Sequence, residues 1–209
     1  MYIPHFNAVH DEDAIRGFVG DVGSAELITV GPDGFPLATL LPVLWHGDTV
    51  IAHMAKANPQ WRTIGTDTPA LMVVAGPQAY VSPSWYATKA EHGRVVPTWN
   101  YSAVHLTGTA TLHTEPEWLR HAVTALTDRH EERREAPWSV DDTPAGFVDK
   151  QLRAIVGIEL TVVRVEAKDK LSQNRSDDDR IGVLQGLSES DDPRDVKVAE
   201  RMARVAHPG

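Results

Sequence analysis

The chain has 209 residues, a formal net charge of −9 and no cysteine. A chain of this length can bury a core without staples, and the lack of cysteine excludes disulfides, zinc-thiolate sites, cysteine nucleophiles and iron–sulfur clusters. The acidic balance argues against direct nucleic-acid binding, because DNA-binding modules usually present a basic face to the phosphates.

No stretch of the sequence reaches the roughly 18–20 apolar residues that a membrane-spanning helix needs. The longest apolar run, residues 37–45, is interrupted by Thr39 and Pro42. The first residues have neither the basic nor the apolar region of a secretory signal peptide. We therefore expect a cytoplasmic protein without a membrane partner.

The first part of the chain predicts a helix and then an antiparallel meander. Apolar residues at helical spacing indicate a helix over residues 11–22. Strands are expected at residues 24–30, 35–44 and 49–54. They are separated by the turn sequences Gly31-Pro32-Asp33-Gly34 and Gly47-Asp48. Asn58-Pro59 then begins a short helix, with Asn as the N-cap and Pro at the first position.

The remainder of the chain predicts further strands and peripheral helices. Strands are expected at residues 69–75, 78–82, 103–113 and 156–166. Helices are expected from Pro116 to about residue 130 and at residues 147–155, 179–187 and 194–206. The order lacks the regular βαβ alternation of a parallel doubly wound sheet. It therefore predicts a mostly β (α+β) fold, an antiparallel barrel with helices at its periphery.

Residues 83–102 show no periodicity and are predicted to be a long loop. A structureless segment of about 20 residues is uncommon in a compact domain and is often functional. It contains Trp85, Lys89 and Trp99 together with two tyrosines. Aromatic side chains seek burial, which favours a ligand or subunit interface over a mobile surface loop.

Residues 53–62 run from a strand end into the start of the predicted helix. A helix start exposes unpaired backbone N–H groups and attracts anions. Lys56 adds a positive charge, and His53 and Asn58 add donors. The local pattern alone leaves two interpretations open, a phosphate site and an ordinary strand–helix turn with a solvated lysine.

Two other segments carry groups that could meet a ligand. In residues 170–175, Arg175 could clamp an anion, and Gln173 and Asn174 could contact the polar edge of a heterocycle. A solvated loop has the same composition. The strand at residues 36–42 could face a flat ring or belong to the core. The common phosphate-loop and hydrolase motifs are absent, and the ten histidines are dispersed, so we predict no metal site.

Seven segments together carry a resemblance that extends from residue 1 to about residue 187. They read MYIP (1–4), LIT (27–29), ATLLP (38–42), HMAKANPQW (53–61), VSPSWY (81–86), VPTWNY (96–101) and KLSQNR (170–175). In this order they resemble the PaiB-type FMN-binding negative transcriptional regulators.

This resemblance implies an FMN-binding split barrel, similar to pyridoxamine-phosphate oxidases and flavin-reductase-like proteins. It also implies a homodimer with two flavins at the interface, and repression of protease and sporulation genes, a role that transfers less readily than the fold. On this basis, residues 1–175 are expected to form the FMN-binding domain. Residues 176–209 are expected to form a C-terminal helical extension packed on it.

The resemblance and the donor-rich strand ends together predict the contacts to FMN. We expect the donors around Lys56 to hold the phosphate and ribityl chain, and Trp85 and Trp99 to cover the ring. Gln173, Asn174 and Arg175, from the partner subunit, would meet the pyrimidine edge or a substrate. The predicted cofactor-binding residues are Thr39, Leu40, Leu41, His53, Ala55, Lys56, Asn58, Trp85, Lys89, Trp99, Lys170, Gln173, Asn174 and Arg175. No catalytic residue is predicted.

The sequence departs from the expected family pattern at two positions. Leu40 stands where the family block is expected to read Ala-Thr-His-Leu-Pro, which predicts a drier ring pocket or a different cofactor. Lys56 replaces a more usual arginine, which keeps the charge but loses the bidentate fork. Haem, with His53 as a ligand, and deazaflavin are alternatives to FMN. The functional alternatives are a flavin-dependent oxidoreductase acting on a small molecule, a flavin- or haem-sensing regulator without turnover, and a dimeric domain whose cofactor site has decayed.

Overall fold

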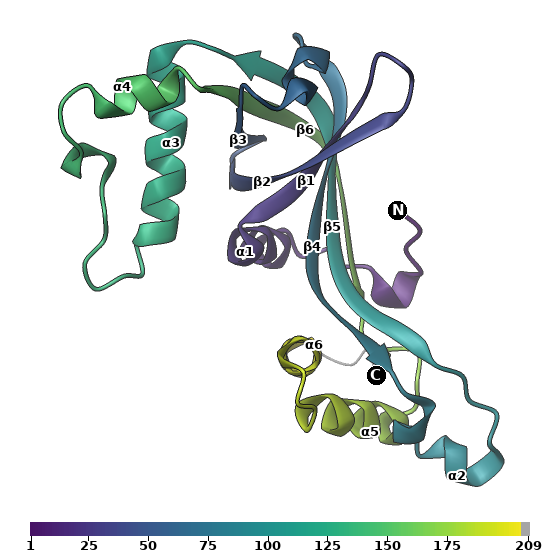
Figure 1. Cartoon of the computed structure of the whole chain (residues 1–209). Helices are drawn as coiled ribbons and strands as arrows, with labels where there is room; N and C mark the ends of the chain where they lie inside the picture. The colour runs from purple at the N-terminus through teal and green to yellow at the C-terminus, as the bar shows by residue number, and fades with distance from the viewer. Residues whose placement is uncertain (206–209) are drawn as a thin grey trace. The chain divides into compact units, whose positions relative to one another are not determined.

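The computed structural model describes residues 1–205 and divides the chain into two compact units. The barrel unit comprises residues 12–74 and 105–165, and the terminal unit comprises, among the described residues, 1–11, 75–104 and 166–205. Strands β4 (Thr68–Val81), β5 (Thr98–His113) and β6 (Ile155–Lys170) each contribute residues to both units (Figure 1). The last residue of the helix predicted at 194–206, and the end of the predicted extension, lie outside the described residues.

The barrel unit confirms the predicted antiparallel barrel. Its strands β1 (Ser24–Val30), β2 (Pro36–His46) and β3 (Thr49–Ala55) follow one another as a meander. The barrel closes in the order β1-β2-β3-β6-β5-β4. The pairs of β1 with β2 and β4, and of β3 with β2 and β6, are antiparallel. The turns at residues 31–34 and 47–48 are where the sequence predicts them.

The barrel core follows from alternating apolar residues along each strand. In β3, for example, Val50, Ala52 and Met54 are buried, while the residues between them are half-buried. The fully buried side chains of the barrel unit include Leu27, Met72, Leu106, Ile158 and Leu160. Each of these contributes about 1.5–3 kcal/mol by leaving water.

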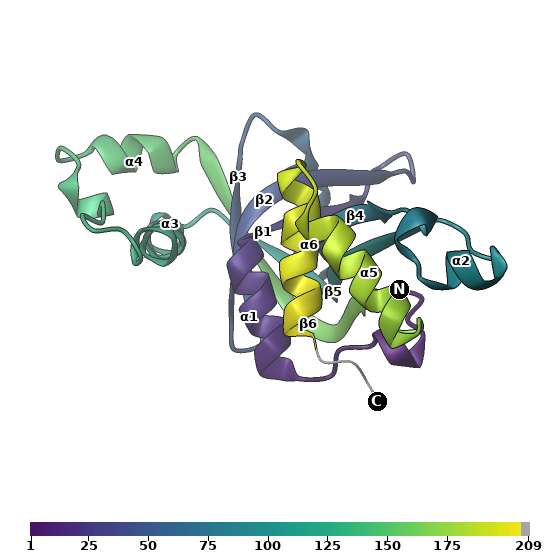
Figure 2. The same cartoon turned by 90° about the horizontal axis from the view of Figure 1, so that it is seen from below.

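Helices cover the outside of the barrel strands. Helix α1 (Glu12–Val22) buries Ile15, Phe18 and Val19 and packs on β2. Helix α3 (Pro116–Glu131) lies against β2 and β3 and buries an apolar stripe that includes Leu119 and Leu126. The short helices of this unit are η2 (Pro59–Thr63), η4 (Val140–Asp142) and α4 (Phe147–Leu152). Figure 2 shows α3 and α4 next to each other in the connection between β5 and β6.

The terminal unit has an apolar core of its own. Its helices are η1 (His5–Asn7), η3 (Pro83–Trp85), α2 (Thr88–His92), α5 (Asp177–Ser188) and α6 (Pro193–Arg204). Helices α5 and α6 pack against each other (Figure 1). The buried core includes Val81, Leu171, Val183, Leu187, Val198 and Met202. Two polar caps begin the helices, because Ser176 accepts from the Asp179 N–H of α5 and Asp192 accepts from the Arg194 N–H of α6.

Several predicted boundaries were wrong. The helix predicted at residues 147–155 ends at Leu152, and Ile155 already belongs to β6. Residues 69–75 and 78–82 are not two strands but parts of the single strand β4, which continues through Gly76-Pro77. Strand β1 pairs with β4 only over Leu71–Val73, so Pro77 lies beyond that ladder, and its missing N–H leaves no β1 bond unmade. Residues 83–102 are not structureless, since they contain η3, α2 and the start of β5. Strand β6 continues to Lys170, which the sequence analysis placed after the strand.

Among residues 1–205, no helix is long and apolar enough to cross a membrane.

Candidate functional site

Strands β2 and β3 separate at the segments from which the first predicted contacts come. Their ladder runs from His46–Thr49 to Val43–Ala52 and ends there within the described residues. The next residue of β2 is Pro42, which has no N–H to donate. Beyond this point β2 stays with β1 and β3 stays with β6. We call residues 40–42 and 53–55, which the same register would have paired, the β2–β3 split.

The side chains of Asn58 and Thr39 meet beside this split. Asn58 caps η2 by accepting a hydrogen bond from the Gln60 N–H at 3.0 Å. Its amide nitrogen donates to the Thr39 hydroxyl at 2.9 Å, and that hydroxyl donates to the Gln60 side-chain oxygen. The structure therefore brings together two predicted contacts that are 19 residues apart in the sequence. One N–H of the Asn58 amide remains for a further acceptor.

Gln60 is the centre of this network, and it is not among the predicted contacts. The residue is only 3% exposed. Its amide nitrogen donates to the Leu27 carbonyl at 3.0 Å, and to the Thr29 hydroxyl and the Leu37 carbonyl at 3.2 Å each. A buried amide with these partners fixes the ends of β1 and β2 against η2. Its only sequence signal was a glutamine inside the quoted HMAKANPQW block.

Lys56 directly follows β3, and its ammonium group has N–H donors left for an anion. The Lys56 Nζ donates to the Arg153 carbonyl at 2.8 Å, and the backbone N–H donates to the Ala154 carbonyl at 2.8 Å. The Trp61 indole N–H donates to the Lys56 carbonyl at 3.0 Å, which holds the turn before η2. The side chain is exposed and, within the described part of the chain, has no carboxylate partner at ion-pair distance.

His53 lies on the opposite face of the sheet from Thr39. It pairs with Gly157 of β6, so its side chain shares the Gly157 face. That face is covered by α3, because a Cβ at Gly157 would stand 2.0 Å from the Trp118 ring. Burial lowers the pKa of His53 below its ordinary value, and its Nδ1 has no hydrogen-bond partner among residues 1–205. A phosphate contact by His53 stays a prediction.

The remaining barrel-unit predictions differ in exposure. Leu40 is 67% exposed and Ala55 is exposed, whereas the Leu41 side chain is buried in the barrel. A ligand beside Leu41 would therefore meet its backbone and not its side chain.

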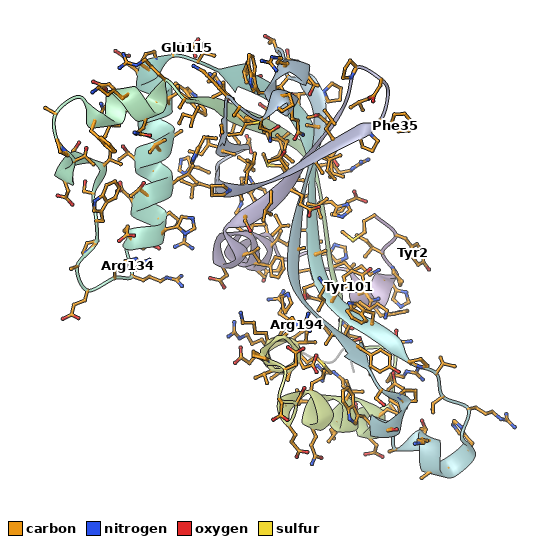
Figure 3. All side chains as sticks on the ribbon, viewed as in Figure 1. Tyr2, Phe35, Tyr101, Glu115, Arg134 and Arg194 are labelled. Carbon is orange, nitrogen blue, oxygen red and sulfur yellow. The ribbon has the colours of Figure 1, made fainter. Side chains whose placement is uncertain are left out.

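In the terminal unit, Lys170 stands among other cations. Its Nζ donates to the Thr98 hydroxyl and to the Trp99 carbonyl. Burial lowers the pKa of Lys170, and the positive charges of Lys168 and Arg175 lower it further. Three cations near one another are suited to an anionic ligand, and Lys168 was not among the predicted contacts. Lys168 donates to the Tyr101 hydroxyl at 2.8 Å and to the Tyr2 carbonyl at 3.1 Å, and Figure 3 labels both tyrosines.

The loop after β6 uses some of its predicted contacts internally. Gln173 is buried, and its side chain accepts from the Leu171 N–H and donates to the Asp169 carbonyl, both at 2.6 Å. Asn174 is exposed. The Arg175 guanidinium lies 4.5 Å from the centroid of the Tyr86 ring. Gln173 therefore shapes the loop, while Asn174 and Arg175 keep donors for a ligand.

The predicted residues of the 83–102 segment also have separate surroundings. The Trp85 ring packs on α5, where a Cβ at Gly186 would stand 2.4 Å from it. Lys89 is exposed and donates to the Ser84 hydroxyl at 3.1 Å. Trp99 is 47% exposed, and its indole N–H donates to the Gln78 side chain at 3.0 Å. Of the two tryptophans, Trp99 has the freer ring face.

The sequence matches the model of one protein family, described as "Putative FMN-binding domain", over residues 1–164. The chain is also 34% identical, over 206 residues, to the protein called "Protease synthase and sporulation protein PAI 2" of Bacillus subtilis. That alignment covers 97% of this chain and 96% of the relative.

Two solved structures share the fold. A protein from Mycobacterium smegmatis, described as binding FAD and heme, has a TM-score of 0.62 and 19% identity, covering 84% of this chain and 78% of that one. A flavocytochrome from Azotobacter vinelandii has a TM-score of 0.58 and 17% identity, covering 79% of this chain and 70% of that one.

Proposed function

Because this chain belongs to the FMN-binding family whose model it matches over residues 1–164, we propose that it is a flavin-dependent regulator that holds the FMN phosphate at the β2–β3 split. It is an FMN-binding split-barrel protein, and FMN is its cofactor. The predicted individual contacts, the regulatory role and the homodimer are parts of the proposal.

The β2–β3 split is the observation that carries this proposal. The end of the ladder at Val43–Ala52 leaves strand edges that a ligand can reach. On one side the Asn58 amide offers an N–H, and at the end of β3 Lys56 offers a positive charge without a carboxylate partner among the described residues. A phosphate needs this combination of fixed neutral donors and one cation.

The donor set suits FMN. Lys56 and the remaining Asn58 N–H bind the phosphate, and Gln60 keeps Asn58 and Thr39 in place. The Thr39 hydroxyl donates its proton to Gln60, so it can only accept a hydrogen bond from the ribityl chain. Leu40 gives the exposed outer face an apolar surface for the ring. Bound FMN supplies reversible redox chemistry and visible absorption.

The terminal-unit contacts belong, in this proposal, to the second subunit of a homodimer. Trp99 would cover the ring, and Lys170 and Arg175 would place positive charge near the pyrimidine edge. Positive charge there favours an anionic reduced ring and so raises the potential of the flavin. Exposed apolar side chains of the barrel unit, such as Leu40 and Val163 at 67% and 71%, support a surface that a second copy covers.

A regulatory role is favoured by the relative of nearly equal length whose name refers to protease synthesis and sporulation. The net charge of −9 favours regulation without direct nucleic-acid contact. We therefore expect no turnover when NAD(P)H and an electron acceptor are added to the FMN-loaded protein.

An absorbance spectrum and an FMN titration of the purified full chain test this proposal. We expect flavin bands, saturable FMN binding, and weaker binding by the Lys56→Ala and Arg175→Ala variants. A Soret band in place of flavin bands would support haem, and unchanged affinity in both variants would refute the assigned contacts. Turnover with NAD(P)H would support the oxidoreductase alternative.

A further inference from the structure

A pocket of about 540 Å³ lies in the barrel unit, between the β1–β2 hairpin and η2. It is lined by Val30, Gly31, Pro32, Leu37, Pro59, Arg62 and Thr63. None of these residues belongs to the predicted flavin contacts. The volume lies within the usual range of roughly 300–1,000 Å³ for pockets that bind small molecules.

Backbone hydrogen bonds shape the hairpin wall of this pocket. The Gly31 N–H donates to the Phe35 carbonyl at 2.7 Å, and the Gly34 N–H donates to the Gly31 carbonyl at 2.9 Å. Gly31 must lack a side chain, because a Cβ there would stand 2.8 Å from the Asp33 carboxylate and 3.0 Å from the Phe35 carbonyl. Figure 3 shows Phe35 where the loop of this hairpin joins β2. A preformed wall lowers the entropy that a ligand loses on binding.

Most of the pocket lining is apolar, and one lining residue is charged. Val30, Pro32, Leu37 and Pro59 present hydrocarbon. The Thr63 hydroxyl is already engaged, because it donates to the Gln60 carbonyl at 2.8 Å and lies 3.0 Å from the Thr29 hydroxyl.

The charged lining residue is Arg62. Its guanidinium lies 5.1 Å from the centroid of the Trp61 ring, and it has no ion-pair partner among residues 1–205. The planar fork of an arginine matches a carboxylate with two parallel hydrogen bonds.

We propose that this pocket binds a small organic carboxylate with an apolar body, and that Arg62 pairs with its carboxylate. Arg62 supplies one positive charge, which balances a monoanion. A phosphate would also need neutral donors beside that cation, but the Thr63 hydroxyl and the Gly31 N–H already donate to backbone carbonyls. The hydrocarbon walls would leave the hydroxyl groups of a sugar or another polyol without hydrogen-bond partners. The pocket shares no residue with the predicted flavin contacts, but it adjoins the network that supports them, because the Leu37 carbonyl and the Thr63 hydroxyl both bond to Gln60.

The test uses hydrocinnamate as the probe, with 3-phenylpropanol as its neutral counterpart and inorganic phosphate as a plain anion. Binding to the full chain is followed by titration calorimetry. Two variants address the pocket. Arg62→Gln removes the charge, and Val30→Glu places a carboxylate on an exposed wall residue. The matched control is Arg94→Gln, an exposed arginine of the terminal unit. Circular dichroism verifies that each variant is folded.

We expect hydrocinnamate to bind more tightly than the alcohol or phosphate. Arg62→Gln should weaken it about tenfold or more, because a charge-assisted hydrogen bond is lost. Val30→Glu should abolish binding, and Arg94→Gln should leave it unchanged. Saturating FMN should leave the probe bound. The proposal is overturned if hydrocinnamate does not bind, if Arg62→Gln binds it like the original chain, if phosphate binds more tightly, or if FMN displaces it completely. An absence of FMN binding would count against the proposed function alone.

Discussion

Gln60 in the barrel unit and Asp169 in the terminal unit are both buried polar residues that tie elements together, but they do so differently. Gln60 is neutral and connects β1, β2 and η2 through amide, hydroxyl and carbonyl groups. Asp169 is charged and 3% exposed. It accepts from the Arg201 guanidinium of α6 at 2.8 and 3.2 Å and from the Ser102 hydroxyl of β5.

The difference shows which polar network can serve a ligand. Around Asp169 the donors face inward and match the carboxylate oxygens, so this network holds α6 on the strands. Around Gln60 the network ends at Asn58, which keeps one N–H, close in sequence to the cation of Lys56. In a charged network of this kind, losing one member leaves the other charge buried without a partner. A neutral one can position donors at a surface with little response to pH.

The largest expected effect on stability comes from removing the positive charge of the buried Asp169–Arg201 ion pair. Arg201→Met should lower the free energy of unfolding by about 3–5 kcal/mol, because it leaves the Asp169 carboxylate buried without its cation. Urea denaturation measures this, with Arg204→Met on the exposed face of the same helix as the control. The double variant Asp169→Leu with Arg201→Met should recover most of the loss. A loss below about 1 kcal/mol in the single variant would show that the pair does not hold α6.

A smaller effect is expected at the neutral network. Gln60→Leu should cost about 2–3 kcal/mol, because the Leu27 and Leu37 carbonyls and the Thr39 hydroxyl lose a buried partner. It should also weaken FMN binding, since Asn58 and Thr39 lose their support. Urea denaturation and FMN titration measure the two effects, with the exposed Gln151→Leu as the control. If Gln60→Leu binds FMN with the affinity of the original chain, the Gln60 network does not support FMN binding.

The smallest expected effect is the pH dependence of stability that comes from His53. The Gln60 network contains no titratable side chain, so it should add nothing to this dependence. Burial lowers the pKa of His53 below 6.5, so the unfolded chain binds this proton more readily than the folded one. The stabilising contribution of neutral His53 is complete above pH 6.5 and is lost as the pH falls toward its folded-state pKa. The urea midpoint should therefore fall less between pH 7.5 and pH 5.5 in His53→Gln than in the original chain. If the urea midpoint falls equally in the two proteins, His53 does not contribute to the loss of stability at low pH.

Local sequence signals predicted the meander well. Strand β1 has the bounds that the turn sequences indicate, and helix α3 begins at Pro116 as expected. Strand β4 was wrongly divided at Gly76-Pro77. A proline interrupts a strand only where the neighbouring strand needs a backbone N–H at that position, which proline lacks. That depends on where the ladder with β1 ends, and a single sequence does not reveal a register.

The sequence predicted which residue types lie at the candidate site. It did not predict which of them face a ligand and which support the fold. The donors Thr39 and Asn58 do meet, and Lys56 is at the strand end. Gln60 was missed because its importance comes from burial among strand ends that are distant in sequence. Gln173 was predicted to contact a ligand, but its side chain turns inward and bonds the backbone of its own loop. Composition cannot distinguish an amide that faces a ligand from one that closes a turn.

A comparison of FMN with riboflavin, which lacks the phosphate, tests the central claim most directly. Both flavins are titrated into the original chain and into Lys56→Ala, with the exposed Lys150→Ala as the control. If Lys56 holds the phosphate, its removal should weaken FMN about tenfold or more and leave riboflavin unchanged, because only FMN loses a charge-assisted hydrogen bond. Equal losses for the two flavins, or none for either, would contradict a phosphate site at the β2–β3 split.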